Sequence, residues 1–107
     1  MVVSRFSVWL VDLNPVAGSE QAGTRPVLVI SPDVMNDKLN TVIAAPMTTQ
    51  RRGWPTRVEV HHAGKHGEVA LDQIRTVDKS RLIKSLGSLD QQYHQALFRT
   101  LHAIFSE

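Results

Sequence analysis

The stretch Val27-Leu-Val-Ile-Ser31 is a run of branched apolar residues that is too short to form a helix. A similar short run, Val42-Ile-Ala-Ala45, follows it. Continuous apolar runs of this length are typical of strands buried on both faces, so we predict two central strands. The segment between them, Pro32 to Lys38, suits a short helix with Ser31 as its N-cap and Pro32 at its first position.

Further strand and loop patterns lie on both sides of this pair. Residues 5–12 carry apolar side chains on both faces and predict a largely buried strand, and residues 14–26 combine Asn-Pro, glycines and polar residues as a long loop does. Residues 48–56 predict another loop. Residues 57–61 then alternate polar and apolar side chains, as an edge strand would, and residues 68–75 are the expected partner strand.

The last part of the chain predicts mainly helix. Residues 78–81 fit one helical turn and residues 83–86 a short strand. Ser88 to Gln91 fits a capping box, in which Ser88 accepts from a backbone N–H, and apolar residues then recur every three to four positions up to Phe105. A strand-rich body with helices to one side predicts an α+β domain or small barrel, and we expect residues 1–107 to form a single domain.

The composition excludes several classes of protein. The chain has no cysteine, so neither a disulfide framework nor a thiolate zinc site is possible. It also lacks the roughly eighteen consecutive apolar residues of a membrane span, and we expect a cytoplasmic protein. A net charge of +2 is compatible with a polyanionic partner without requiring one. The small core that such a chain can build favours dimerisation.

Three nearby histidines do not predict a metal site. His61 and His62 are adjacent in a predicted strand, so their side chains point to opposite faces, and no carboxylate completes a convincing set with His66. We therefore expect no metal centre in this protein.

A set of short motifs occurs in order along the chain: Trp9-Leu-Val-Asp-Leu-Asn-Pro15, Gly18-Ser-Glu-Gln21, Arg25-Pro26, Pro46-Met-Thr-Thr49 and Asp72-Gln73, followed by the terminal helix. Together they resemble the MazF/PemK toxins, the ribonuclease components of toxin–antitoxin pairs, from about residue 5 to the C-terminus. The resemblance implies an SH3-like β-barrel of about five to seven mostly antiparallel strands, with a short internal helix and a C-terminal amphipathic helix.

The same resemblance implies an activity and its partners. The chain would be a sequence-selective endoribonuclease that cleaves single-stranded RNA, mRNA in particular, through attack of a 2′-hydroxyl on the adjacent phosphate. Neither a metal nor a cofactor is implied. The expected partners are a second copy of the chain, in a homodimer, and a cognate antitoxin, usually a small acidic protein whose disordered tail occupies the RNA groove.

Two residues of the shared motifs suit the phosphate. Arg25 can hold two phosphoryl oxygens with its planar fork and stays protonated at physiological pH, so it stabilises charge better than it accepts a proton. Thr48, in the turn expected after the second central strand, offers a hydroxyl and a backbone N–H. The matching family position is catalytic.

The proton acceptor has two candidates, Glu20 in the first loop and Asp72 in a late strand, and both match family positions. Some members are thought to use an aspartate at the Asp72 position with an arginine two residues earlier, but this chain has Ala70 there. That departure makes Glu20 a rival base and leaves Arg25 or a water as the proton donor. Asp72 also has a structural alternative, since a strand aspartate can cap a neighbouring loop.

Unstacked RNA bases need aromatic rings or guanidinium planes. Trp54 in the second loop is the best candidate platform, although it could also pack over the end of the barrel, whereas Trp9 lies in a buried strand and is expected in the core. Arg57 and other loop arginines are expected to contact phosphates. The full set of predicted RNA-binding residues is Ser19, Gln21, Thr49, Gln50, Arg51, Arg52, Trp54 and Gln73.

The main alternative is a different activity on the same barrel. Some toxins of this fold poison DNA gyrase without cleaving nucleic acid, and a Trp-Gly-Ile type tail after the last helix makes the decisive contact. This sequence reads Ala-Ile-Phe-Ser-Glu107 at that place, which disfavours the gyrase hypothesis.

Overall fold

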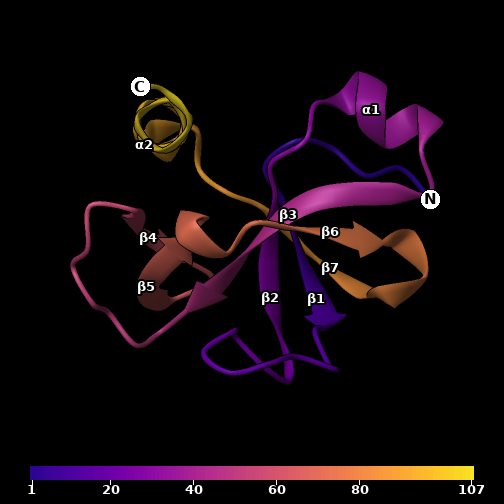
Figure 1. The fold of residues 1–107 in the computed structure, drawn as a ribbon. Coiled ribbons are helices and arrows are strands. Elements are labelled where there is room, and N and C mark those ends of the chain that lie inside the picture. The colour runs from indigo at the N-terminus through magenta and orange to yellow at the C-terminus, as the bar shows by residue number, and fades with distance from the viewer.

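The protein is a strongly curled, seven-stranded antiparallel sheet with one long helix packed against it (Figure 1). The computed structural model describes all 107 residues. The strands are β1 (Ser7–Asp12), β2 (Thr24–Val29), β3 (Thr41–Thr48), β4 (Arg57–His62), β5 (Lys65–Ala70), β6 (Arg75–Asp78) and β7 (Leu82–Ser88). The helices are α1 (Asp33–Lys38) and α2 (His94–Phe105), with 3-10 turns η1 (Leu71–Gln73), η2 (Lys79–Arg81) and η3 (Gln91–Tyr93). This confirms the predicted α+β fold.

The sheet runs in the order β4-β5-β3-β2-β1-β7, and β6 pairs with the first half of β3. The long strand β3 therefore contacts β2, β5 and β6, and the sheet curls around it into a half-barrel (Figure 1). As predicted, β4 lies at one edge.

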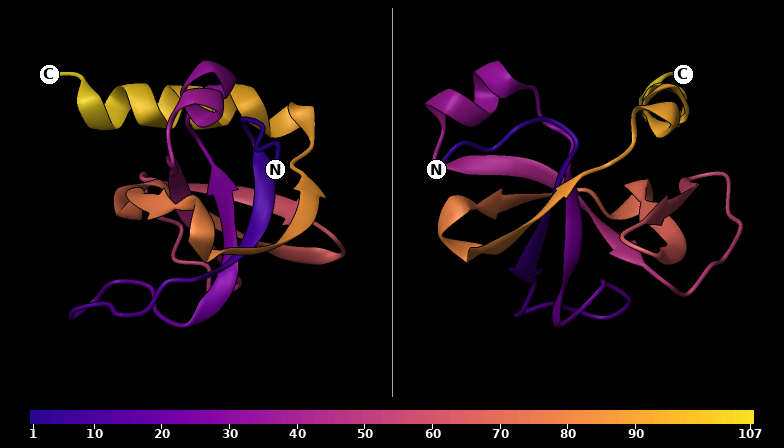
Figure 2. Two further views of the ribbon diagram at one scale, coloured as in Figure 1. Left: turned by 90° about the vertical axis from the view of Figure 1, so that its right-hand side faces the viewer. Right: turned by 180° about the vertical axis from the view of Figure 1, so that it is seen from behind.

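Each face of the curled sheet carries its own hydrophobic core, because successive side chains of a strand point to opposite faces. From β3, Ala45 and Met47 join a cluster that packs under α2 through Leu97. Val42 and Ala44 join a second cluster on the other face. Figure 2 shows α2 crossing the end of the sheet opposite to the loop between β1 and β2.

The terminal helix is amphipathic, as predicted. Leu97 is completely buried, Phe98 is partly exposed and packs against the ring of Phe6, and Phe105 is exposed. Neither this helix nor α1 is long and apolar enough to cross a membrane.

Two predicted helix caps are wrong. The Ser31 hydroxyl does not cap α1, because it donates to Oδ1 of the buried Asn36 at 2.5 Å, and the N-cap position is Pro32. Ser88 is the last residue of β7, and the side chain of Asp90 instead accepts from the N–H of Gln92 at 2.9 Å.

Three strand boundaries also differ from the predictions. Strand β2 begins at Thr24, so Arg25 lies in a strand rather than in the preceding loop, and Thr48 is the last residue of β3 rather than part of a turn. The expected strand over residues 68–75 is interrupted by η1, so Asp72 lies in a 3-10 turn. In each case cross-strand pairing, which a local pattern does not reveal, decided where the strand ends.

Candidate active site

Arg25 and Thr48 lie on the same face of the sheet. Strands β2 and β3 pair Val27 with Pro46, and continuing this antiparallel register by two residues places Arg25 opposite Thr48. Strand β5 then pairs Glu68 with Thr48, so the same face continues to Glu68. Directly opposed residues point to the same side. The register therefore brings an arginine, a threonine and a carboxylate together from three strands.

Arg25 and Thr48 each keep hydrogen-bond donors that no other protein group uses. Nε of Arg25 donates to the carbonyl oxygen of Ala22 at 3.1 Å, and its terminal nitrogens have no protein partner. Oγ1 of Thr48 accepts from the N–H of Gln50 at 3.1 Å, which leaves the hydroxyl proton available. A bound anion could therefore receive hydrogen bonds from both side chains.

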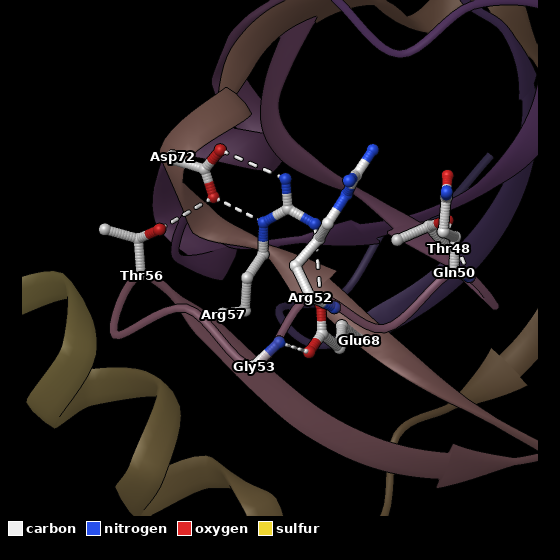
Figure 3. Close-up of polar contacts among 8 residues, drawn as sticks. All are labelled: Thr48, Gln50, Arg52, Gly53, Thr56, Arg57, Glu68 and Asp72. Atoms are coloured by element: carbon white, nitrogen blue, oxygen red, sulfur yellow. Dashed lines mark hydrogen bonds and ion pairs between the residues drawn. The ribbon is translucent and has the colours of Figure 1, made fainter.

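A buried carboxylate anchors the loop after Thr48 (Figure 3). The side chain of Glu68 is only 4% exposed; it accepts from the N–H groups of Arg52 at 2.9 Å and Gly53 at 2.8 Å and pairs with Arg57 at 3.5 Å. Burial raises the pKa of Glu68, but these hydrogen bonds and the charge of Arg57 outweigh it and hold the pKa below its usual value. The carboxylate is therefore ionised at neutral pH.

Arg57 is not the exposed phosphate contact that the sequence predicts. Its side chain is 3% exposed and binds Asp72 through Nε at 2.7 Å and through Nη2 at 3.3 Å (Figure 3). The hydroxyl of Thr56 donates to the same carboxylate at 3.0 Å. Burial raises the pKa of Asp72, but the hydrogen bonds from Arg57 and Thr56 lower it to a net value below normal.

Trp54 is half-exposed, at 48%. The guanidinium carbon of Arg57 lies 4.7 Å from the centre of the indole ring, and that of Arg52 lies 5.5 Å away. These are cation–π distances. The ring does not pack into either core cluster, so the alternative that it closes the end of the barrel is not what the structure shows.

The two candidate bases line one small pocket of about 190 Å³. Its other lining residues are Leu13, Gln21, Pro46, Gln73, Ile74 and Arg75. Because Pro46 is two residues before Thr48 in β3, this pocket opens on the same face as the Thr48 side chain. Oε1 of Glu20 accepts only from the N–H of Ala17, at 2.6 Å, so Glu20 is held less firmly than Asp72.

A larger cavity of about 610 Å³ opens on the other face of the sheet. Its lining includes Met47 and Val60, which belong to the core under α2, together with Leu86 from β7. Arg25 and Thr48 are among its lining residues, although the strand register places their side chains on the opposite face of the sheet from Met47. We therefore assign the site to the smaller pocket and its surroundings. His62 and Lys65 also line the larger cavity, and no sequence signal indicated them.

The remaining predicted residues surround the site in two loops. Ser19 is exposed in the loop between β1 and β2, and the N–H of Gln21 donates to Oε1 of Gln73 at 2.7 Å, which ties that loop to η1. Thr49 and Gln50 are exposed directly after β3.

The histidine region is occupied by side-chain pairs. Arg51 turns toward β4 and β5, where Nη1 lies 3.2 Å from Glu59 and 3.2 Å from Nδ1 of His66. Nε2 of His66 lies 2.5 Å from the Glu59 carboxylate. The ring of His61 meets that of His66 edge to face, whereas Nε2 of His62 lies 2.9 Å from the carbonyl oxygen of Leu86, so the adjacent histidines diverge as predicted.

Gly67 is a further site residue that sequence reasoning missed. A Cβ atom at this position would lie 2.4 Å from the carbonyl oxygen of Thr48, a distance that no side chain tolerates. Only glycine lets β5 approach the end of β3 this closely. The single clue in the sequence is a glycine inside a strand pattern.

The structure is that of a small half-barrel protein with an arginine and a threonine side by side on one face of its sheet. Residues 4–105 match the family model of the PemK-like, MazF-like toxin of type II toxin-antitoxin system. The chain is 43% identical over 99 residues to endoribonuclease EndoA of Bacillus subtilis, with 86% of this chain and 84% of that protein covered. The chain therefore belongs to the PemK/MazF toxin family.

Solved structures agree with this membership. The structure superimposes on the MazF crystal structure of Deinococcus radiodurans with a TM-score of 0.86 and 29% identity, covering 97% of this chain and 96% of that one. It also resembles a mycobacterial endoribonuclease in complex with its cognate antitoxin, with a TM-score of 0.81 and 27% identity over 94% of this chain and 92% of that one. None of these relatives is described as acting on gyrase, so the gyrase alternative has no support.

Proposed function

We propose that this chain is the endoribonuclease toxin of a type II toxin–antitoxin pair and cleaves single-stranded RNA without a metal ion. The observation that carries the proposal is that the strand register places the half-buried Arg25 and Thr48 side by side on one sheet face, next to a pocket lined by two carboxylates. The 43% identity to an endoribonuclease supports the same reaction class.

Arg25 and Thr48 bind the scissile phosphate in this mechanism. The terminal nitrogens of Arg25 are free to hold two phosphoryl oxygens, and the Thr48 hydroxyl is free to donate to one of them. Both groups then stabilise the charge that grows on the phosphoryl oxygens as the 2′-hydroxyl attacks. Arg25 or a bound water supplies the proton to the leaving 5′-oxygen.

We infer that Glu20, rather than Asp72, accepts the 2′-hydroxyl proton. Asp72 already receives hydrogen bonds from Arg57 and Thr56, and its lowered pKa makes it a weak base. Glu20 makes one hydrogen bond within its own loop and lines the same pocket. The absence of an arginine at Ala70 supports this choice, because Asp72 lacks the acid partner found in some relatives.

The partners follow from the family. A relative was solved with its cognate antitoxin, and we propose that this chain likewise binds an antitoxin and forms a homodimer in the cytoplasm, where mRNA is found. The two loops around the site carry the predicted RNA contacts.

Purified protein is incubated with mixed-sequence RNA in EDTA, and the ends of the products are analysed. We expect cleavage in EDTA with a 2′,3′-cyclic phosphate or 3′-phosphate end.

Arg25→Ala and Thr48→Val are each expected to lower the cleavage rate by about a hundredfold, the scale of losing one preorganised donor. Arg99→Ala on the exposed side of α2 serves as the control. RNA that stays intact would refute the proposal.

A further inference from the structure

The loop between β3 and β4, residues 49–56, is fixed by a cluster of three charged side chains, two of them buried, that the cleavage mechanism does not use. Arg57, Glu68 and Asp72 form this cluster, which we call the Arg57 clamp. The guanidinium holds one carboxylate on each side, and three of its nitrogens are engaged (Figure 3). Such a fork has one orientation only, which a lysine ammonium could not reproduce.

The clamp reaches Trp54 by two routes. The guanidinium of Arg57 lies 4.7 Å from the indole ring centre, so it supports the ring directly. Glu68 holds the backbone N–H groups of Arg52 and Gly53, the two residues before Trp54, so it fixes the chain that carries the ring. Both the ring and its backbone are thus held by the same buried cluster.

Trp54 is nevertheless half-exposed, on the loop that begins directly after Thr48. The exposed part of the ring is open to an incoming ligand, while the buried cluster holds its position. Rings of this kind stack unpaired nucleobases, and a ring fixed beforehand loses little conformational freedom when a base arrives.

We propose that Arg57 is a positioning residue for RNA binding, which holds Trp54 ready to stack an unpaired base next to the cleavage site. This inference rests on the proposed ribonuclease function. Arg57 does not touch the RNA; it acts through Trp54. Asp72 and Glu68 then serve to orient Arg57, and this gives Asp72 a role that does not require it to accept a proton.

The test measures RNA binding in full-length protein that carries Trp9→Phe, so that Trp54 is the single tryptophan. The probe is a mixed-sequence, 2′-O-methylated single-stranded RNA, which lacks the attacking hydroxyl. We expect it to quench Trp54 emission. Arg57→Lys, which keeps the charge but loses the fork, should weaken binding about tenfold, within the range of one lost base stack. In cleavage assays with unmodified RNA, Arg57→Lys should also raise KM more than it lowers kcat. Arg99→Lys on α2 is the matched control.

A double-mutant cycle separates positioning from a merely structural role. If Arg57 acts through Trp54, Arg57→Lys should have no further effect on binding in a Trp54→Leu background, where binding is followed by the anisotropy of the same RNA carrying a fluorescent label. Full additivity would overturn the proposal, as would unchanged binding and quenching in a folded Arg57→Lys protein.

A second variant tests the proposal even if Arg57→Lys fails to fold. Arg57→Met with Glu68→Met replaces the buried pair by apolar groups of similar size, which folded proteins commonly accept. We expect this variant to fold and to bind RNA weakly, and wild-type binding by it would overturn the proposal. Wild-type protein that neither binds nor cleaves RNA would instead refute the proposed function itself.

Discussion

The two loops that border the site are held in different ways. The loop between β1 and β2, residues 13–23, is held by the buried Leu13 at its start and beyond it by single hydrogen bonds, such as those from Ala17 to Glu20 and from Gln21 to Gln73. The loop between β3 and β4, residues 49–56, is tied to a buried ion cluster. The loop that carries Glu20, the proposed proton acceptor, can therefore move locally. The loop that carries Trp54, the ring proposed to stack a nucleobase, is fixed.

The largest expected effect comes from breaking the second loop's anchor. Arg57→Met leaves the carboxylate of Glu68, 4% exposed, without its cation, and we expect the free energy of unfolding to fall by about 3–5 kcal/mol. Urea denaturation measures this. The matching change in the first region, Arg25→Met, should cost little because Arg25 forms no ion pair. Equal losses for the two variants would show that the loops do not differ as described.

A smaller loss of stability is expected from a substitution at Gly67, which lies against the end of β3. Gly67→Ala places a Cβ against the carbonyl oxygen of Thr48, and the strands must separate to relieve the contact. We expect about 1–3 kcal/mol of destabilisation, typical of overpacking, together with slower RNA cleavage because Thr48 is displaced. Thermal unfolding and initial rates test this, and normal values for both would contradict the close approach of β5.

Acid should weaken the anchor of the second loop. Glu68 and Asp72 have pKa values lowered by folding, so their contribution to stability is fully present above the pKa of the unfolded chain. It is lost as the pH falls below about 4, the ordinary range of these side chains, through their folded-state pKa values. Unfolding free energies between neutral pH and pH 3 should therefore decline more steeply for wild type than for Asp72→Asn. A pair of parallel curves would count against the clamp.

The smallest effect is expected from the first loop. Gln73→Ala removes one hydrogen bond to the N–H of Gln21, worth about 0.5–1.5 kcal/mol. Because no buried ion cluster holds residues 14–23, the change should appear mainly as faster amide hydrogen exchange within these residues. Residues 49–56 should exchange as before, and faster exchange there would mean that the two loops are coupled.

Local patterns predicted much of the fold. The apolar runs at 27–31 and 42–45, the alternation at 57–61 and the helical periodicity before Phe105 all correspond to observed elements, because each reports which face of its own segment is buried. The errors lie at element ends. Arg25, Thr48 and Asp72 were placed in the wrong kind of element because pairing with a distant strand decides where a strand starts or stops.

The sequence by itself determined the family and the approximate strands and helices, and it predicts Arg25 and Thr48 as site residues, since all of these depend on residue types in a fixed order. Only the tertiary structure decided that Arg57 is buried between two carboxylates rather than exposed, and that Glu68 anchors the neighbouring loop. These contacts depend on the register between β3, β4 and β5. A shift of one residue would turn every side chain of a strand to the opposite face, and no short stretch of sequence encodes that choice.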